Sequence, residues 1–339
     1  MKLTQAKEVI VRAFNTNRDL YAEGAKASEL LNVYLVGDPG LGKTAIVRQA
    51  AEELGVECRE VIVGQYDPGE LAGLVYLKED SYVRARPNWL PEEGEGILFL
   101  DELPQAVVMS QNLMAQLTNE RCIGEHKLGD GWQIVAAGNK TANRAGTSVM
   151  PTHLRDRLLF VEVEVNMDDV VEFFNGQGTD ERITGMMRYR PDFIAKFDAG
   201  ADACPSPRSW MRVNTILGMD LEGFTEFETI KGTIGEAAAT DFKGYCDLYH
   251  KMPDPDGIID NPEDGEIPED PALLFALTSA LSARANKENV GAILTYVNRL
   301  INKEFAVFCV KDMGSRFPEL RKEKALREWI MKEGKELLF

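Results

Sequence analysis

Long hydrophobic runs are missing from this 339-residue sequence. No apolar stretch approaches the roughly 20 residues that a helix needs to cross a bilayer. The N-terminal residues, MKLTQAKEVIVRAF, place charges among apolar residues at helical spacing, unlike a secretory signal. We therefore expect a cytoplasmic protein without a membrane-spanning segment.

Cysteine and histidine are scarce as well, with five and three residues respectively. The cysteines are scattered, with no CxxC pair and no neighbouring histidine, so neither a disulfide framework nor a zinc site is expected. The thiols are typical of a reducing compartment. The histidines, which are His126, His153 and His250, have no ligand spacing between them, and this argues against a metal site built from imidazoles.

Basic residues do not balance the acidic ones: 38 Lys and Arg stand against 55 Asp and Glu, a formal net charge of −17. This charge argues against a protein that coats nucleic acid or an anionic membrane over its whole surface. A local basic pore loop is compatible with it, so nucleic acid is not excluded as a partner. The hydrophobic content of 44% and the length indicate a globular protein of about two domains.

From residue 32 to about 165, short β-rich runs alternate with helical patterns. The runs are NVYLVG, ECREVIVG, GILFLDE, WQIVAAGN and LLFVEVEV, at 32–37, 57–64, 96–102, 132–139 and 158–165. Near-continuous apolar strands that alternate with helices predict an α/β fold with a parallel sheet covered on both faces. Ahead of this core, residues 1–31 read as two helices that pack on its outside.

Residues 166–251 contain helical patterns without matching strands, which predicts a smaller helical domain after the core. Residues 252–271 are rich in proline and acidic residues, and we expect an exposed loop there. As an EF-hand loop starting at Asp260, this segment has proline at ligand positions 3 and 12, so the calcium motif fails. Residues 272–339 read as a C-terminal helical extension.

The motif with the most specific chemistry is GDPGLGKT, residues 37–44, which follows a predicted strand and opens a predicted helix. It fits G-x-x-x-x-G-K-[ST], a loop that wraps its backbone N–H groups around the phosphates of a nucleotide. Lys43 is expected to reach the β- and γ-phosphates of ATP, and the Thr44 hydroxyl to bind Mg²⁺. The rest of the predicted ATP site comprises Gly37, Asp38, Pro39, Gly40, Leu41, Gly42 and Ala45.

Two further strands end in polar residues at the carboxyl edge of the predicted sheet, where ligands of open α/β folds bind. After ILFL, Asp101 is placed to hold Mg²⁺ and Glu102 to polarise the attacking water. After WQIVAAG, Asn139 is placed to orient that water against the γ-phosphate, although a plain asparagine turn would give the same pattern.

The order of these motifs, followed by MPTHLRDRLLFVEVEV and SPRSW, resembles the AAA+ ATPases over roughly residues 30–220. Within them the chain looks most like the MoxR branch, whose members carry a β-hairpin inserted in the helix after the second strand. The segment DPGELAGLVYLKEDSYVRARPNWLPEEGEGILFLDE has that layout, with LVYL and YVRAR as the strands. The resemblance implies an ATP-hydrolysing ring with a core at 32–165 and a helical lid at 166–251.

The resemblance also implies roles for individual residues. Asn139 would be sensor 1, and Arg208 of the SPR segment would be sensor 2. The LRDRL segment implies an arginine finger that acts on a neighbouring subunit's ATP, with Arg157 the better candidate and Arg155 the second. The sequence departs from common MoxR members at Leu158, where an aromatic usually follows the finger, in its acidic loop and in its helical tail.

The start of the SPRSW helix supports the sensor assignment on physical grounds. Ser206 is a good N-cap and Pro207 suits the first turn, but Arg208 opposes the helix dipole there. Such a broken local rule is expected where a phosphate supplies the missing negative charge. The alternatives are an ordinary surface arginine here and a solvated turn at residues 155–157.

The leading prediction is an ATPase motor of chaperone type, a homo-hexamer that remodels a partner protein. The family implies a partner that carries a von Willebrand A-type domain. A nucleic-acid motor or loader is the second possibility, against which stand the net charge and the lack of a recognisable DNA-binding module. A scaffold with little hydrolysis is the third, against which stand Glu102 and Asn139. A small-molecule kinase would leave the finger and sensor 2 segments without a purpose.

Overall fold

The computed structural model describes residues 1–140, 149–198 and 200–332, and it divides into two compact units. Unit 1 comprises Met1–Glu164 and unit 2 comprises Val165–Phe339. Each unit has its own apolar core, so each is described by itself.

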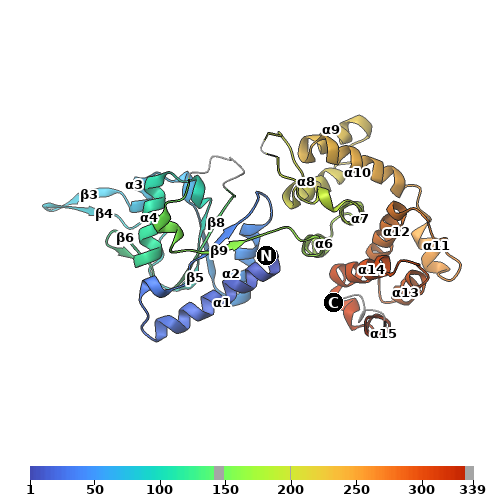
Figure 1. The fold of residues 1–339 in the computed structure, drawn as a ribbon, viewed down its shortest axis with the longest axis horizontal. Coiled ribbons are helices and arrows are strands. Elements are labelled where there is room, and N and C mark those ends of the chain that lie inside the picture. The colour runs from blue at the N-terminus through green and yellow to red at the C-terminus, as the bar shows by residue number, and fades with distance from the viewer. Residues whose placement is uncertain (141–148, 199, 333–339) are drawn as a thin grey trace. The chain divides into compact units, whose positions relative to one another are not determined.

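Unit 1 is built on a five-stranded sheet (Figure 1). Its strands are β1 (Val33–Val36), β2 (Glu57–Ile62), β5 (Glu95–Asp101), β8 (Gly131–Gly138) and β9 (Leu159–Glu162). The strand order is β2-β5-β8-β1-β9, and every neighbouring pair is parallel. The predicted α/β fold with a parallel sheet is therefore confirmed, and the carboxyl ends of β5, β8 and β1 lie next to one another.

Helices cover both faces of this sheet, as the buried residues of β5 show. Ile97 and Phe99 belong to the apolar cluster formed with the N-terminal helices, while Leu98 and Leu100 belong to the cluster on the opposite face. This alternation is the period of two expected of a strand that is buried on both sides. The helices of unit 1 are α1 (Leu3–Ala22), α2 (Lys43–Leu54), α3 (Pro68–Ala72), α4 (Val108–Glu120) and α5 (Thr152–Arg155).

The N-terminal segment differs from its prediction, because it forms one long helix and not two. Helix α1 runs over 20 residues and packs against α2. It ends next to Gly24, whose φ of +85° favours glycine, and only a short 3₁₀ turn, Ala27–Glu29, precedes β1. Too few residues separate Gly24 from Val33 for a second helix.

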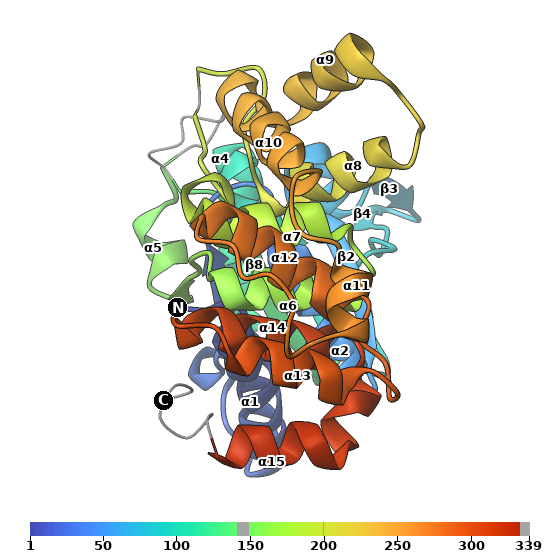
Figure 2. The ribbon, with the colours of Figure 1, turned by 90° about the vertical axis from the view of Figure 1, so that its right-hand side faces the viewer.

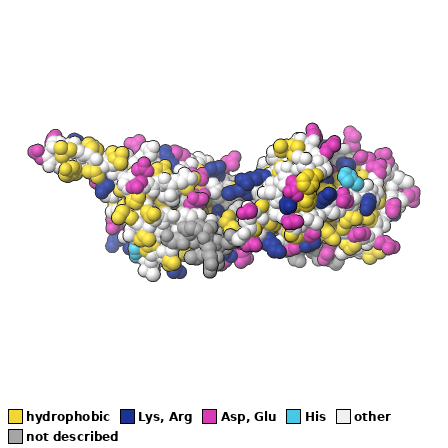
Figure 3. All heavy atoms as spheres, turned by 90° about the horizontal axis from the view of Figure 1, so that it is seen from above, with side chains coloured by type: hydrophobic (Ala, Val, Ile, Leu, Met, Phe, Trp, Pro, Cys, Tyr) yellow, Lys and Arg dark blue, Asp and Glu magenta, His cyan; other side chains and the backbone are white. Residues whose placement is uncertain are grey.

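Two small hairpins project from unit 1 beside the sheet. They are formed by β3 (Val75–Lys78) with β4 (Ser81–Arg84), and by β6 (Cys122–Ile123) with β7 (His126–Lys127). The Arg84 N–H donates to the Glu125 carboxylate at 3.0 Å, which joins the two hairpins. The larger hairpin exposes apolar side chains, among them Leu77 and Tyr82, and forms the arm with yellow side chains in Figure 3.

The described residues of unit 2 form helices and connecting loops without a strand, in agreement with the prediction of helices after the core. Its helices are α6 (Met167–Gly176), α7 (Glu181–Tyr189), α8 (Pro207–Leu217), α9 (Gly223–Ile234), α10 (Glu236–Tyr249), α11 (Pro255–Asp260), α12 (Pro271–Ala283), α13 (Val290–Asn298), α14 (Lys303–Arg316) and α15 (Lys324–Lys332). Helix α12 packs against both α7 and α14, which can be followed in Figure 2.

The segments predicted as a lid and as an extension pack together within this unit. One apolar cluster contains Trp210 and Phe242, and a second contains Tyr296 and Trp329. A buried ion pair between Arg188 of α7 and the carboxylate of Asp312 in α14 joins the two groups of helices. Residues 333–339 of the predicted extension lie outside the described residues.

The structure corrects the prediction of an exposed loop at residues 252–271. Helix α11 lies within this segment, begins at Pro255 and is capped by the Asp254 side chain. Its Ile258 is only 3% exposed and packs in the cluster around Tyr296. The segment is acidic overall, but Met252, Ile259 and Ile267 also pack against this cluster, and these apolar residues anchor it.

In the part of the chain that the structure describes, no helix is both long and apolar enough to cross a bilayer.

Candidate functional site

The loop between β1 and α2 has the backbone that its glycines allow. Gly40 and Gly42 have φ values of +77° and +95°, in the left-handed region that favours glycine. Gly37 is required for a different reason, since a Cβ there would lie 2.8 Å from the Val163 carbonyl oxygen. The loop therefore turns tightly from the end of β1 into the N-terminus of α2.

Lys43, the first residue of α2, lies almost completely buried beneath this loop. Its Nζ donates to the carbonyl oxygens of Gly37 and Asp38, each at 2.9 Å, and to Oδ1 of Asn139 at 3.2 Å. These bonds direct the ammonium group along the inside of the loop, where phosphates bind in a P-loop.

Thr44 and Asp101 bring two oxygen atoms together at the carboxyl edge of the sheet. The Thr44 hydroxyl donates to Oδ2 of Asp101 at 3.0 Å. Within the described ranges no group of three or more His, Cys, Asp or Glu side chains is placed to hold a metal ion. One hydroxyl and one carboxylate nevertheless fit Mg²⁺, because this ion keeps several waters and takes few protein ligands.

Glu102 follows β5 in an uncommon backbone conformation, with a φ of +55°. Its own N–H donates to Oδ1 of Asp101 at 2.8 Å, and its carbonyl accepts from the Gln105 N–H at 2.9 Å. These bonds hold the strained residue in place and leave its side chain exposed. Non-glycine residues in this region are often found at functional sites.

Two hydrogen bonds bring together four of the predicted site residues. One joins Lys43 to Asn139, and the other joins Thr44, the next residue in the chain, to Asp101. These four residues come from three segments that meet because β5, β8 and β1 are adjacent. Of the remaining residues of the predicted ATP site, Asp38, Pro39 and Leu41 belong to the same β1–α2 loop, and Ala45 lies in the first turn of α2.

Arg155 and Arg157 lie at the opposite edge of the sheet. Both precede β9, and Asn32, which precedes β1, donates to the Arg157 carbonyl oxygen at 3.3 Å. Arg157 is half-buried, and its guanidinium donates to the His153 carbonyl, whereas Arg155 is exposed beside the Phe160 ring. At about 3.3 Å per residue, the length of β9 separates Arg157 from the P-loop edge by about 16 Å.

Arg208 belongs to unit 2, where it is the second residue of α8. The Ser206 hydroxyl caps this helix by accepting from the Ser209 N–H at 3.1 Å, and Pro207 occupies the first turn. The arginine side chain is exposed. The local geometry thus matches the predicted helix start.

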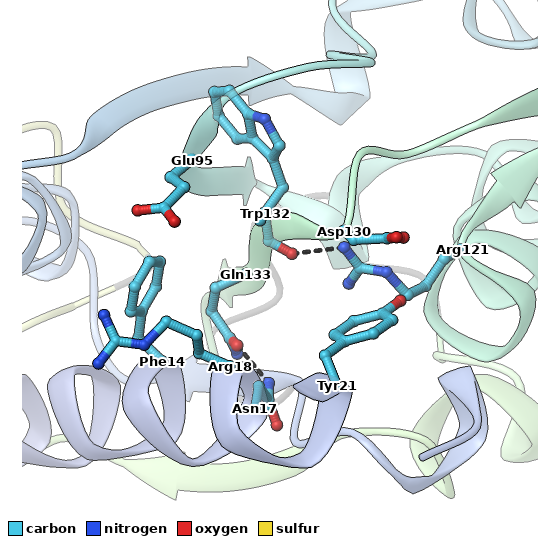
Figure 4. Close-up of a pocket in the computed structure, with 10 residues that line it drawn as sticks. Phe14, Asn17, Arg18, Tyr21, Glu95, Arg121, Asp130, Trp132 and Gln133 are labelled. Atoms are coloured by element: carbon cyan, nitrogen blue, oxygen red, sulfur yellow. Dashed lines mark hydrogen bonds between the residues drawn. The ribbon is translucent and has the colours of Figure 1, made fainter. Parts of the chain in front are cut away.

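Sequence reasoning missed two charged groups near the sheet edges. At the carboxyl edge, Lys140 forms an ion pair with Glu162 at 2.6 Å. At the amino edge, Arg121 lines a cavity of about 200 Å³, shown in Figure 4. The first pair depends on strand order, which the sequence does not state, and the second reads as an ordinary basic residue after a helix.

Comparison with known proteins finds a match within the first unit. Residues 33–158 match the family model for AAA, the ATPase family associated with various cellular activities. No curated protein matches the chain.

Several solved structures have a similar fold. A mutant of RuvB from Thermotoga maritima matches with 16% identity and a TM-score of 0.41, over 82% of this chain and 81% of that chain. NtrX from Brucella abortus matches with 14% identity and a TM-score of 0.39, over 94% of this chain and 67% of that one.

Proposed function

We propose that this chain, whose residues 33–158 match the AAA family model, binds Mg²⁺ and ATP at the carboxyl edge of its sheet and hydrolyses the ATP to ADP and phosphate. The observation that carries the proposal is the linked set of Lys43, Thr44, Asp101 and Asn139. The hydrogen bonds of Lys43 to the loop carbonyls and to Asn139 orient a cation toward the phosphate loop.

Each of these residues has a distinct task in this proposal. Lys43 binds the β- and γ-phosphates, and Thr44 and Asp101 hold Mg²⁺, which neutralises charge on the phosphate oxygens. Glu102 polarises the attacking water, and Asn139 orients it. The exposed Glu102 side chain at the end of β5 is free to turn toward that water.

The arginines before β9 support a multi-subunit site. Arg157 and Arg155 lie across the sheet from the P-loop of their own unit, at about 16 Å along β9. An arginine there can serve as a finger only for the ATP of another subunit. We therefore propose a homo-oligomer, hexameric as in the MoxR-like AAA+ proteins, with Arg157 as the finger and Arg208 as sensor 2.

The exposed hairpin of β3 and β4 favours a protein partner over nucleic acid. Its exposed side chains include Val75, Tyr76, Leu77 and Tyr82, at 50–80% exposure. Adjacent exposed apolar side chains of this kind commonly mark protein-binding surfaces. The hairpin also exposes Lys78 and Arg84, but the acidic Glu79 and Asp80 form its turn, which disfavours contact with phosphates. We propose that the oligomer remodels a partner protein, for which a von Willebrand A-type domain is the candidate.

Phosphate release from ATP by the purified chain tests the activity. We expect hydrolysis that depends on Mg²⁺ and is absent from Lys43→Ala, and an assembly that forms with a non-hydrolysable ATP analogue, seen by light scattering. Equal phosphate release by the wild type and Lys43→Ala would contradict the activity. A monomer at high concentration with the analogue would contradict the oligomer, and strong stimulation by DNA would favour the nucleic-acid motor.

A further inference from the structure

The end of β8 carries an ion pair with no assigned role in the proposed chemistry. Lys140 directly follows Asn139, and its Nζ lies 2.6 Å from Oε1 of Glu162, the last residue of β9. In the sheet, β1 lies between β8 and β9. The ion pair therefore crosses the carboxyl end of β1, where the chain enters the P-loop at Gly37.

Backbone hydrogen bonds tie the three strands together at the same place. The Gly37 N–H donates to the Gly138 carbonyl at 3.3 Å, and the Val163 N–H donates to the Val36 carbonyl at 2.8 Å. The pairing of β1 with β8 ends at Gly138, so Asn139 lies one residue beyond it. The ion pair of Lys140 therefore holds residues 139–140, which lie beyond the pairing of β8 with β1.

A contribution to the stability of the fold does not explain why this ion pair is present. The side chains of Lys140 and Glu162 are 34% and 57% exposed, and ion pairs with this exposure stabilise proteins little. The same unit contains a close match, Lys7 and Glu53, at 2.7 Å with 32% and 52% exposure. This pair joins α1 to α2 at Glu53, ten residues along the chain from Lys43. The Lys140–Glu162 pair lies beside Asn139 and the P-loop, whereas the Lys7–Glu53 pair joins two helices.

We propose that Lys140 is a positioning residue, whose ion pair with Glu162 holds the end of β8 so that the Asn139 carboxamide faces the P-loop lysine. The contact that depends on it is the 3.2 Å hydrogen bond from Lys43 Nζ to Asn139 Oδ1. The inference rests on the proposed function, in which Asn139 orients the attacking water. Loss of the pair then lowers turnover more than it lowers ATP affinity.

A double-mutant cycle with a matched control tests this role. Lys140→Met and Glu162→Gln should each lower kcat about tenfold, and the double variant should fall no further, because both changes remove one interaction. KM should stay within about twofold of the wild-type value, because the pair does not contribute to binding the substrate in the ground state. Lys7→Met and Glu53→Gln should leave both constants unchanged.

Hydrogen exchange of residues 131–140 supplies a readout that needs no turnover. Lys140→Met should speed exchange at the end of β8, whereas Lys7→Met should not. Unchanged exchange, unchanged kcat, or a double variant whose loss is the product of the single losses would overturn the proposal. A wild type without hydrolysis would instead contradict the proposed function, and hydrogen exchange would still decide whether the pair positions the strand.

Discussion

The two edges of the sheet in unit 1 each hold a buried cation that donates to backbone carbonyls. At the carboxyl edge Lys43 is 8% exposed and bonds to the carbonyls of Gly37 and Asp38. At the amino edge Arg121 is 5% exposed and bonds to the carbonyls of Gly129 and Trp132, at 2.7 and 2.6 Å. Burial and bonding alone therefore do not distinguish a ligand-binding cation from a structural one.

The neighbours of the two cations make the distinction. Lys43 lies beneath a loop with left-handed glycines, beside Thr44 and Asp101, and its partners can be exchanged for phosphate oxygens. The Arg121 guanidinium lies 5.2 Å from the centroid of the Tyr21 ring. Figure 4 shows both residues beside Asn17 and Gln133, which are hydrogen-bonded to each other. The Nη2 atom of Arg121 donates to two backbone carbonyls and its guanidinium lies over the Tyr21 ring, whereas its buried Nε has no hydrogen-bond partner among the described residues. No phosphate-binding loop adjoins it, so we expect a role in packing.

The largest effect is expected from Lys43→Ala. This change should abolish ATP binding and leave the fold intact, because the lysine contributes phosphate contacts and little core packing. Calorimetric titration with ATP measures the affinity, and circular dichroism measures the fold. The control is Arg48→Ala, an exposed position on the same helix, which should bind ATP normally. Unchanged affinity in Lys43→Ala would remove the distinction between the two cations.

The next largest effect concerns the arginines at the amino edge. As a finger, Arg157 stabilises charge that develops in the transition state, so Arg157→Ala should lose about 10³- to 10⁵-fold in turnover and keep its ATP affinity. Mixtures of Arg157→Ala and Lys43→Ala subunits should regain activity, because some sites then combine an intact Lys43 with an intact Arg157.

Arg155→Ala is the matched control for the finger, and it should be the milder change. Arg155 is the more exposed of the two side chains, so exposure alone would favour Arg155 as the finger. A greater loss in Arg155→Ala would place the finger two residues earlier. If the mixed subunits demonstrably co-assemble but show no ATPase activity, a finger that acts between subunits is excluded.

A smaller loss is expected from Glu102→Gln. The variant should bind ATP normally and hydrolyse it about 10²-fold more slowly, the range for a lost general base. Glu79 provides a control with nearly the same backbone, because its φ is +54° in the turn of the β3–β4 hairpin. Glu79→Gln should keep its basal phosphate release. Turnover near that of the wild type in Glu102→Gln would show that another group activates the water.

These expectations differ in how far the sequence alone supports them. The position of the P-loop, Asp101 and Asn139 at one edge of the sheet could be predicted because each follows a near-continuous apolar strand, and such strands end at one edge of a parallel sheet. The order of the strands is a long-range property, so the pairing of Lys140 with Glu162 could not be predicted. Helix α11 was missed for a similar reason, since composition does not show that Ile258 is buried.

The smallest expected effect is on stability, at Arg121. Burial lowers the pKa of this guanidinium, because removing the charge from water costs free energy. The two hydrogen bonds and the Tyr21 ring offset this cost. Arg121→Met should remove the side-chain donor from the carbonyls of Gly129 and Trp132, the first of which keeps the Trp132 N–H as a donor. The free energy of unfolding should fall by about 1–3 kcal/mol, measured by urea denaturation. The ATP affinity of the folded variant should not change.

Arg18 supplies the matched control for this prediction, because it lines the same cavity but is exposed. Arg18→Met should stay within about 0.5 kcal/mol of the wild type, as surface substitutions usually do. If Arg121→Met is equally mild, the bonds to the carbonyls of Gly129 and Trp132 contribute little, and the amino edge does not need its cation for packing. If Arg121→Met instead loses ATP affinity while it stays folded, the two edges of the sheet are coupled and the comparison between them fails.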